Sequence, residues 1–201
     1  DGILYVQASE AASPAEMKRV HSDRDHWSWA ELSTGYYAKP RVPWGFGRHL
    51  AAYDIATDQL LWAHSEREAI DSRAIGICED KLYFYAPDSR VGCLDCATGQ
   101  LLWVNDDAET LAAIEQQGEG LTSTPGFRSN CMLLCSPETL FFESQTRQHV
   151  VAVSAKDGSR LWTKNKQRND PTLLFLDGQL ITSHLNSETI ALNPISGERE
   201  E

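Results

Sequence analysis

The sequence predicts an all-β protein built from about four copies of one four-stranded antiparallel unit. Three segments align with one another, each running from an apolar stretch through a polar turn to Leu-Trp: residues 50–62, 91–103 and 150–162. A fourth copy, residues 189–201, keeps the stretch and the turn but ends where the Trp is expected. Internal repeats of this kind indicate units that bury their apolar faces against one another.

The spacing of the copies indicates which kind of unit repeats. Trp62 lies 41 residues before Trp103, and Gly158 lies 39 residues before Gly197. A period near 40 fits a four-stranded β-propeller blade and is too long for a leucine-rich repeat.

One interval between copies is longer than the others. Trp103 and Trp162 are 59 residues apart. Within this interval, residues 106–117 are rich in helix formers, begin with Asp and are followed by Gly118. The sequence therefore predicts a short helical insertion near 106–117, carried on a loop.

Two more β-rich runs precede each of the later copies. The first runs are residues 74–78, 131–135 and 173–176, and the second runs are residues 81–85, 139–142 and 179–183. Each unit therefore reads as four consecutive strands, which make one propeller blade.

The turn within each copy has residues suited to it. Gly99 supplies the positive φ that such a hairpin turn needs. In the first copy Asp58 stands at the equivalent position, where the positive φ costs some conformational free energy. Side chains ahead of the turn are expected to bond to nearby backbone amides: Asp54, Asp95, Asn193 and, more weakly, Ser154. The Trp of each copy is expected to pack between neighbouring blades.

The pattern Ala-x-Asp-x-x-Thr-Gly-x-x-Leu-Trp, clearest in residues 93–103, resembles the PQQ-like repeat of the quinoprotein alcohol dehydrogenase-like superfamily. The resemblance covers the chain from about residue 49 onward. It implies part of a seven- or eight-bladed ring that is completed by remaining blades or by a protein partner. The run Trp44-Gly-Phe-Gly-Arg48 is similar to uncharacterised bacterial envelope propellers, which implies a periplasmic or otherwise extracytoplasmic location.

The resemblance leaves the activity open, because enzymes and scaffolds share this repeat. Catalytic relatives use PQQ with a calcium ion held by Glu and Asn, a base Asp, and often adjacent cysteines. This sequence has no adjacent Cys-Cys and matches neither the calcium-binding Glu nor the base Asp by motif. We therefore expect a non-catalytic binding or scaffolding domain, with a PQQ-dependent oxidoreductase and a carbohydrate-binding propeller as alternatives.

Polar loops that lead into the innermost strands are the predicted ligand site. They carry Asp71, Arg73, Arg128, Asn130 and Asp170. Because inner strands line the propeller channel, these side chains are expected to converge on it and to bind a small molecule. The arginines would hold an anionic group, since a guanidinium makes paired bonds to carboxylates. Solvated loop residues with local Asp partners are the alternative.

An aromatic-rich insertion, residues 10–47, is predicted within the first blade. It contains Trp27 and Trp44, which are candidates for stacking on a sugar or a partner. A lid that packs on the propeller face is the other interpretation. Long insertions that are rich in aromatic residues are often functional and seldom disordered.

The odd number of cysteines, five, excludes complete pairing within the chain. Cys131 and Cys135 would lie about 13 Å apart on one strand, too far for a disulfide unless the segment turns. Either could pair with Cys78 or Cys93 on a neighbouring blade, or all could be buried thiols. Cys93 and Cys96 form a C-x-x-C, but on a strand they face opposite sides and cannot share a metal.

Charge and hydropathy exclude further classes of function. The formal net charge is −11, which argues against a nucleic-acid partner and against a polybasic membrane contact. No stretch approaches 18 consecutive apolar residues, so no membrane span is expected. The opening residues are unlike a signal peptide, and we expect the true N-terminus to be missing.

Overall fold

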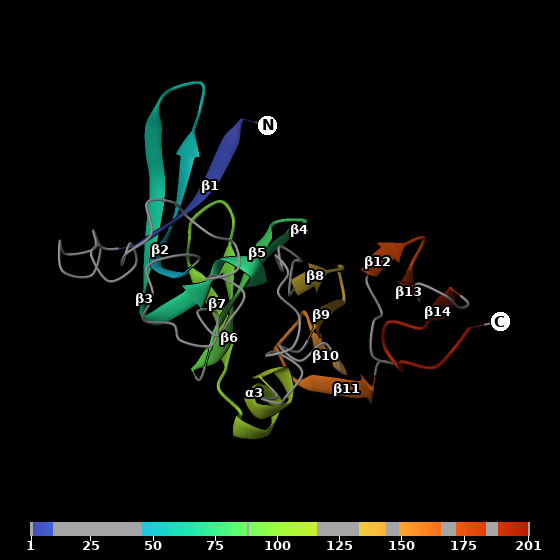
Figure 1. The fold of residues 1–201 in the computed structure, drawn as a ribbon. Coiled ribbons are helices and arrows are strands. Elements are labelled where there is room, and N and C mark those ends of the chain that lie inside the picture. Colours follow the sequence, from blue (N-terminus) through green and yellow to red (C-terminus); the bar gives the residue numbers. More distant parts are fainter. Residues whose placement is uncertain are drawn as a thin grey trace, which may run out of the picture.

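A computed structural model confirms the all-β prediction. It describes residues 2–9, 46–87, 89–115, 133–143, 149–165, 172–183 and 189–200. The described strands form four antiparallel sheets, each made of strands consecutive in the chain. The sheets follow one another from the β1 end to the β14 end of the molecule (Figure 1), as successive propeller blades do.

We call the sheets blades 1 to 4. Blade 1 consists of β1 (Ile3–Ala8), β2 (Phe46–Asp54) and β3 (Gln59–Asp71). Blade 2 consists of β4 (Ile75–Cys78), β5 (Lys81–Ala86), β6 (Arg90–Asp95) and β7 (Leu101–Asn105). Blade 3 consists of β8 (Leu133–Cys135), β9 (Thr139–Glu143), β10 (His149–Ser154) and β11 (Arg160–Asn165). Blade 4 consists of β12 (Thr172–Leu176), β13 (Gln179–Ser183) and β14 (Ile190–Leu192), and Arg199 bridges to Leu192.

The strand register repeats from blade to blade and fixes which positions are equivalent. Asp54 pairs with Ile3, Asp95 with Lys81, and Ser154 with Thr139. The outer pair of strands shifts register at the same place in each of these blades: between Ala52 and Tyr53, Cys93 and Leu94, and Ala152 and Val153. A one-residue bulge beside the turn is therefore part of the repeat.

The repeated turns have the predicted geometry. The turn glycines have positive φ, and Asp58, which takes the Gly place in blade 1, has φ 55°. The predicted acceptors receive backbone N–H bonds from the residues that follow them: Asp54, Asp95 and Asn193 through Oδ1, and Ser154 through Oγ. These bonds satisfy turn amides that no strand partner reaches.

The predicted helical insertion is α3 (Ala108–Glu115). Asp107 caps it, because its Oδ2 accepts the backbone N–H of Thr110 at 2.8 Å. Ile114 is fully buried and belongs to the same apolar cluster as strands of blades 2 and 3. The helix therefore packs against the blades as part of the core, which the loop interpretation did not foresee.

The core lies between blades, as three apolar clusters. Strand β5 shows why. Its Leu82 and Phe84 pack with blade 1, whereas Tyr83 and Tyr85 pack with blade 3. A strand buried on both faces is apolar at every position, so β5 reads as a continuous run without alternation. No helix among these residues is long and apolar enough to cross a membrane.

Candidate functional site

The predicted ligand residues Asp71 and Arg73 bond to each other. Asp71 ends β3, and Arg73 lies in the short 3-10 helix η2 (Ser72–Ala74). Asp71 Oδ1 accepts from the backbone N and from Nε of Arg73 at 2.9 and 3.0 Å, and Oδ2 accepts from Nη2. The side chains of Asp71 and Arg73 are 1% and 14% exposed. The forked edge of this guanidinium is thus engaged by a carboxylate within the same turn, as in the local-partner alternative.

The other predicted site residues lie outside the described residues: Arg128, Asn130, Asp170, Trp27, Trp44 and Cys131. Their assignment to a ligand site stays a prediction, as does the role of residues 10–47.

The calcium site of PQQ-dependent relatives needs several oxygen-donating side chains close together. Nowhere in the described ranges do three or more His, Cys, Asp or Glu side chains come together so that they could hold a metal ion.

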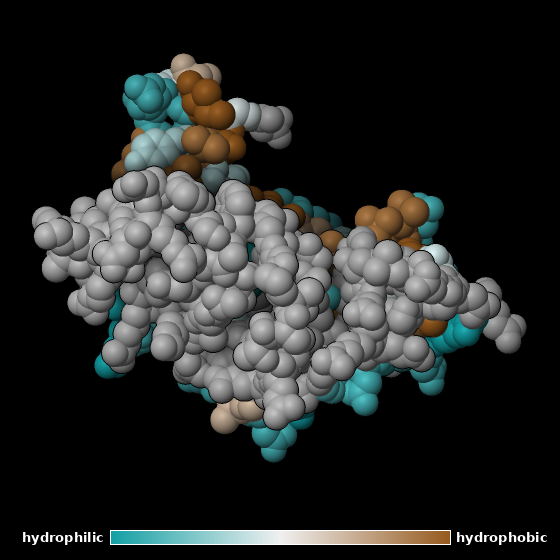
Figure 2. All heavy atoms as spheres, viewed as in Figure 1, coloured by the Kyte–Doolittle hydropathy of each residue, from teal (hydrophilic) through white to brown (hydrophobic). Residues whose placement is uncertain are grey.

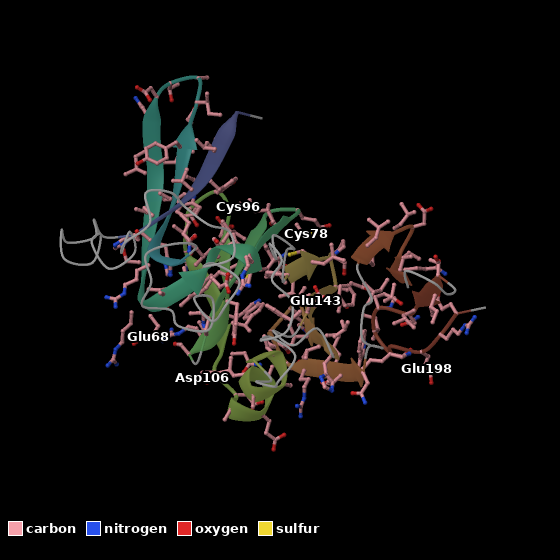
Figure 3. All side chains as sticks on the ribbon, viewed as in Figure 1. Glu68, Cys78, Cys96, Asp106, Glu143 and Glu198 are labelled. Carbon is pink, nitrogen blue, oxygen red and sulfur yellow. The ribbon has the colours of Figure 1, made fainter. Side chains whose placement is uncertain are left out.

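Cys78, Cys93 and Cys96 are thiols, so neither Cys78 nor Cys93 has formed the disulfide that was one of the two predicted alternatives. Cys93 and Cys96 belong to different apolar clusters, on opposite sides of blade 2, as their spacing predicts. Cys96 lies beside blade 1, whereas Cys78 lies beside β8 (Figure 3). Burial raises the pKa of the Cys93 thiol to about 12, so this thiol is not an activated nucleophile.

The most regular arrangement of side chains lies where the blades meet. Trp62 of blade 1 lies against the turn of blade 2, and its Nε1–H donates to the carbonyl oxygen of Cys96 at 2.8 Å. A β-carbon on Gly99, which is in the same turn, would lie 2.6 Å from the Trp62 ring. Gly99 thus has two roles, because its φ of +70° suits the turn and its missing side chain makes room for the indole.

The same contact recurs at the next two junctions. Trp103 donates to the carbonyl oxygen of Ala155 at 3.2 Å, and a β-carbon on Gly158 would lie 2.6 Å from its ring. At the third junction, Trp162 Nε1–H donates to the carbonyl oxygen of Pro194 at 3.0 Å. A β-carbon on Gly197 would lie 2.8 Å from the Trp162 ring. We call each Trp with its facing Gly and carbonyl a Trp lock. The prediction that Trp packs between blades is confirmed.

A second polar contact accompanies two of the locks. Two residues after Trp103, the Asn105 side-chain amide donates to the carbonyl oxygen of Gly158. At the equivalent place, Lys164 Nζ donates to the carbonyl oxygen of Gly197 at 2.8 Å. Sequence reasoning missed these residues, although their position two after each Trp places them on the same strand face.

The junction between blades 1 and 2 uses a different polar contact. His64, at the position of Asn105 and Lys164, pairs with Glu66 Oε1 at 2.7 Å. Arg90 of blade 2 reaches the other oxygen of Glu66, at 3.7 Å from Nε. The Glu66 side chain is 5% exposed, so it requires these partners. The three residues form a polar bridge between the blades, in which the Glu66 carboxylate is the buried group.

β-Blades that repeat about every 40 residues and are joined by Trp locks are typical of a PQQ-like β-propeller. Residues 47–200 match the family described as outer membrane protein assembly factor BamB. The match covers more than half of the chain, and the chain belongs to this family. A search of curated proteins found no match.

Solved structures resemble the chain in fold. The computationally designed Ika8 protein has a TM-score of 0.51 at 15% identity, over 77% of this chain and 43% of that one. BamB from Moraxella catarrhalis has a TM-score of 0.48 at 16% identity, over 77% and 46%. The quinohemoprotein alcohol dehydrogenase from Comamonas testosteroni has a TM-score of 0.48 at 14% identity, over 78% and 33%. The chain thus spans less than half of each of these three proteins.

Proposed function

We propose that the chain is a non-catalytic binding module of a bacterial envelope protein, and that it acts in the periplasm in the assembly of outer-membrane proteins. The observation that carries the proposal is the match of residues 47–200 to the outer membrane protein assembly factor BamB family. Such a role needs a rigid surface for a protein partner and no reactive group.

The use of the repeated side chains agrees with this role. The Asx residues bond to their own turns, and the Trp residues join neighbouring blades. The buried Asp71–Arg73 pair is also internal. These residues build a rigid scaffold. A partner would therefore bind to the exposed sheet edges and loops.

The outer strands offer an edge for a partner. Strand β7 is the last strand of the blade 2 sheet, and its Leu101, Leu102 and Val104 are 39%, 45% and 39% exposed. An edge strand with apolar side chains is a template for a partner strand. We propose that a component of the outer-membrane assembly machinery binds along this edge.

Deletion and complementation in the source organism test the proposal. Deleting the gene is expected to lower the amount of folded outer-membrane β-barrel proteins, measured by quantitative mass spectrometry of outer membranes. Wild-type protein should restore the amount, whereas Leu102→Glu should not. Ile195→Glu is the matched control, because Ile195 is 45% exposed on a turn of blade 4. Unchanged outer-membrane proteins after deletion would reject the assembly role, and full rescue by Leu102→Glu would reject the β7 edge.

A further inference from the structure

Two cysteines from neighbouring blades face the same junction. Cys78 is the last residue of β4 in blade 2, and Cys135 is the last residue of β8 in blade 3. Both are thiols in this structure, both are partly exposed, and both pack against the apolar cluster between these two blades. The junction therefore holds a pair of thiols, one from each blade.

Gly76 shows how closely the two strands approach each other. Gly76 and Cys78 lie two residues apart on β4, so their side-chain positions are on the same face of the strand. A β-carbon on Gly76 would overlap Cys135 Sγ. Because glycine has no side chain, the sulfur of Cys135 fills this place. Cys135 Sγ thus lies against the face of β4 that carries Cys78.

The repeat gives the level of Cys135 along β4. Cys135 pairs with Leu140 on β9. Ile77 pairs with Leu82 on β5, the position equivalent to Leu140. Cys135 therefore stands level with Ile77, one residue before Cys78. With the strands in contact at Gly76, a step of about 3.3 Å is compatible with the Cα separation of a disulfide, about 4.4–6.8 Å.

Tyr83 places both sulfurs near one hydroxyl group. Its side chain is 1% exposed and belongs to the cluster between blades 2 and 3. Burial raises the pKa of the Tyr83 hydroxyl, and the nearby thiols of Cys93, Cys135 and Cys78 raise it further. Because such an effect falls off with distance, Cys78 and Cys135 both lie close to this hydroxyl.

Access distinguishes this pair from the other cysteines of blade 2. Cys93 is fully buried, and Cys96 packs on the opposite side of the blade. The end of β4 that carries Cys78 reaches the surface, since Ile77 is 46% exposed. Figure 2 shows hydrophobic atoms along the upper edge of the molecule, near the place of β4 in Figure 1. An oxidant can therefore reach Cys78 without the blade opening, whereas it cannot reach Cys93.

We propose that Cys78 and Cys135 form a disulfide between blades 2 and 3 by exchange with a reactive disulfide. The Cys78 thiolate attacks one sulfur of the oxidant, which forms a mixed disulfide and releases one thiol. The Cys135 thiolate then attacks Cys78 Sγ, forms the bond between the blades and releases the second thiol. The two protein thiols are oxidised, and the oxidant is reduced to two thiols that take up the two protons. This inference does not depend on the proposed assembly function.

Oxidised glutathione serves as the disulfide in the test. The reduced full-length protein is incubated with it at pH 8, quenched with iodoacetamide and digested with trypsin without reduction. Mass spectrometry then measures the crosslink between peptides 74–81 and 129–147. The second peptide also contains Cys131, so Cys131→Ser is tested beside the wild type. Cys96→Ser is the matched control, because it changes a cysteine of blade 2 that faces blade 1.

The proposal predicts the crosslink in the wild type, in Cys131→Ser and in Cys96→Ser. It should form about tenfold or more faster in the folded protein than in guanidinium, where the two thiols are no longer held together. In Cys135→Ser the mixed disulfide cannot be resolved, so glutathione bound to Cys78 should accumulate to about tenfold the wild-type amount. Oxidation should raise the Tm of the wild type by about 5–10 °C, since the bond spans a long stretch of chain. Dithiothreitol should reverse this rise.

Three results would overturn the proposal. Absence of the crosslink in the folded wild type would show that the junction does not bring the two sulfurs together. Loss of the crosslink in Cys131→Ser would assign the bond to Cys131 instead. Equal amounts of glutathione on Cys78 in the wild type and in Cys135→Ser would show that Cys135 does not resolve the mixed disulfide.

Discussion

The indole of Trp62 lies over Gly99 of the next blade, and its N–H reaches the carbonyl oxygen of Cys96 in the same turn. One residue therefore closes the apolar cluster between blades 1 and 2 and also satisfies a turn carbonyl. The contact recurs at Gly158 and Gly197. In each copy of the repeat, the turn Gly therefore contacts the Trp of the preceding copy.

Replacing Gly99 separates the two roles of this glycine. Gly99→Ala should lower the free energy of unfolding by the strain of positive φ, about 1 kcal/mol, and by about 1–3 kcal/mol more because the Trp62 ring must move. Gly178→Ala is the control, since Gly178 also has positive φ but a β-carbon there would meet nothing within 4 Å. Urea unfolding followed by Trp fluorescence gives both values. A Gly99→Ala variant as stable as Gly178→Ala would show that the indole does not need the glycine.

The loss of stability on replacing Arg73 should depend on whether Asp71 is still present. Arg73→Ala leaves a carboxylate that is 1% exposed without its guanidinium, so it should lower the free energy of unfolding by about 3–5 kcal/mol. The double variant Asp71→Ala/Arg73→Ala should be less destabilised than Arg73→Ala, because no buried charge remains. Chemical denaturation of both variants measures this. If Arg73→Ala is as stable as the wild type, the buried Asp71 carboxylate does not depend on the guanidinium, which would contradict this account of the pair.

Asp95 makes stability depend on acid pH. The hydroxyl and the backbone N–H of Thr98 lower the pKa of this carboxyl, so the stability it contributes is present above its unfolded pKa of about 3.9 and is lost as pH falls through the folded value. Asp95→Asn should keep the turn, since Asn193 occupies the equivalent place, but should lose this dependence. The difference in Tm between wild type and Asp95→Asn should therefore fall between pH 6 and pH 2. A difference that does not change with pH would contradict this role.

The thiols should differ in reactivity according to burial. Cys93 is fully buried and its pKa is raised to about 12, so this thiol stays protonated at pH 8. Cys78 is partly exposed, and burial raises its pKa as well. Iodoacetamide should label Cys78 well before Cys93 in the folded protein, and both at equal rates in guanidinium. Peptide mass spectrometry reads this out, and first labelling at Cys93 would show that blade 2 opens there.

The repeat made the blades predictable from the sequence, because each turn residue and each Trp has a local reason for its place. Position 58 was read correctly, since Asp tolerates positive φ better than most residues. The polar bridge of His64, Glu66 and Arg90 was not predicted. It joins residues of two blades and breaks the pattern set by Asn105 and Lys164, and a repeat pattern carries no information on exceptions between copies.

The packing of α3 was also beyond sequence reasoning. Its helix formers and its Asp cap predicted a helix. The packing partners of Leu111 and Ile114, however, lie on strands of blades 2 and 3, far away in the sequence. Which loop residues converge on a channel likewise depends on the placement of blades, and a spacing along the chain does not determine it.

Quinone-dependent activity tests the non-catalytic account most directly. The purified full-length protein is incubated with PQQ and Ca²⁺, and the reduction of an artificial electron-acceptor dye is followed with alcohols and sugars as substrates, beside a quinoprotein dehydrogenase as positive control. The account predicts no change in the quinone absorbance and no dye reduction above the protein-free rate. Saturable quinone binding with substrate-dependent dye reduction would contradict it and would identify the chain as part of an oxidoreductase.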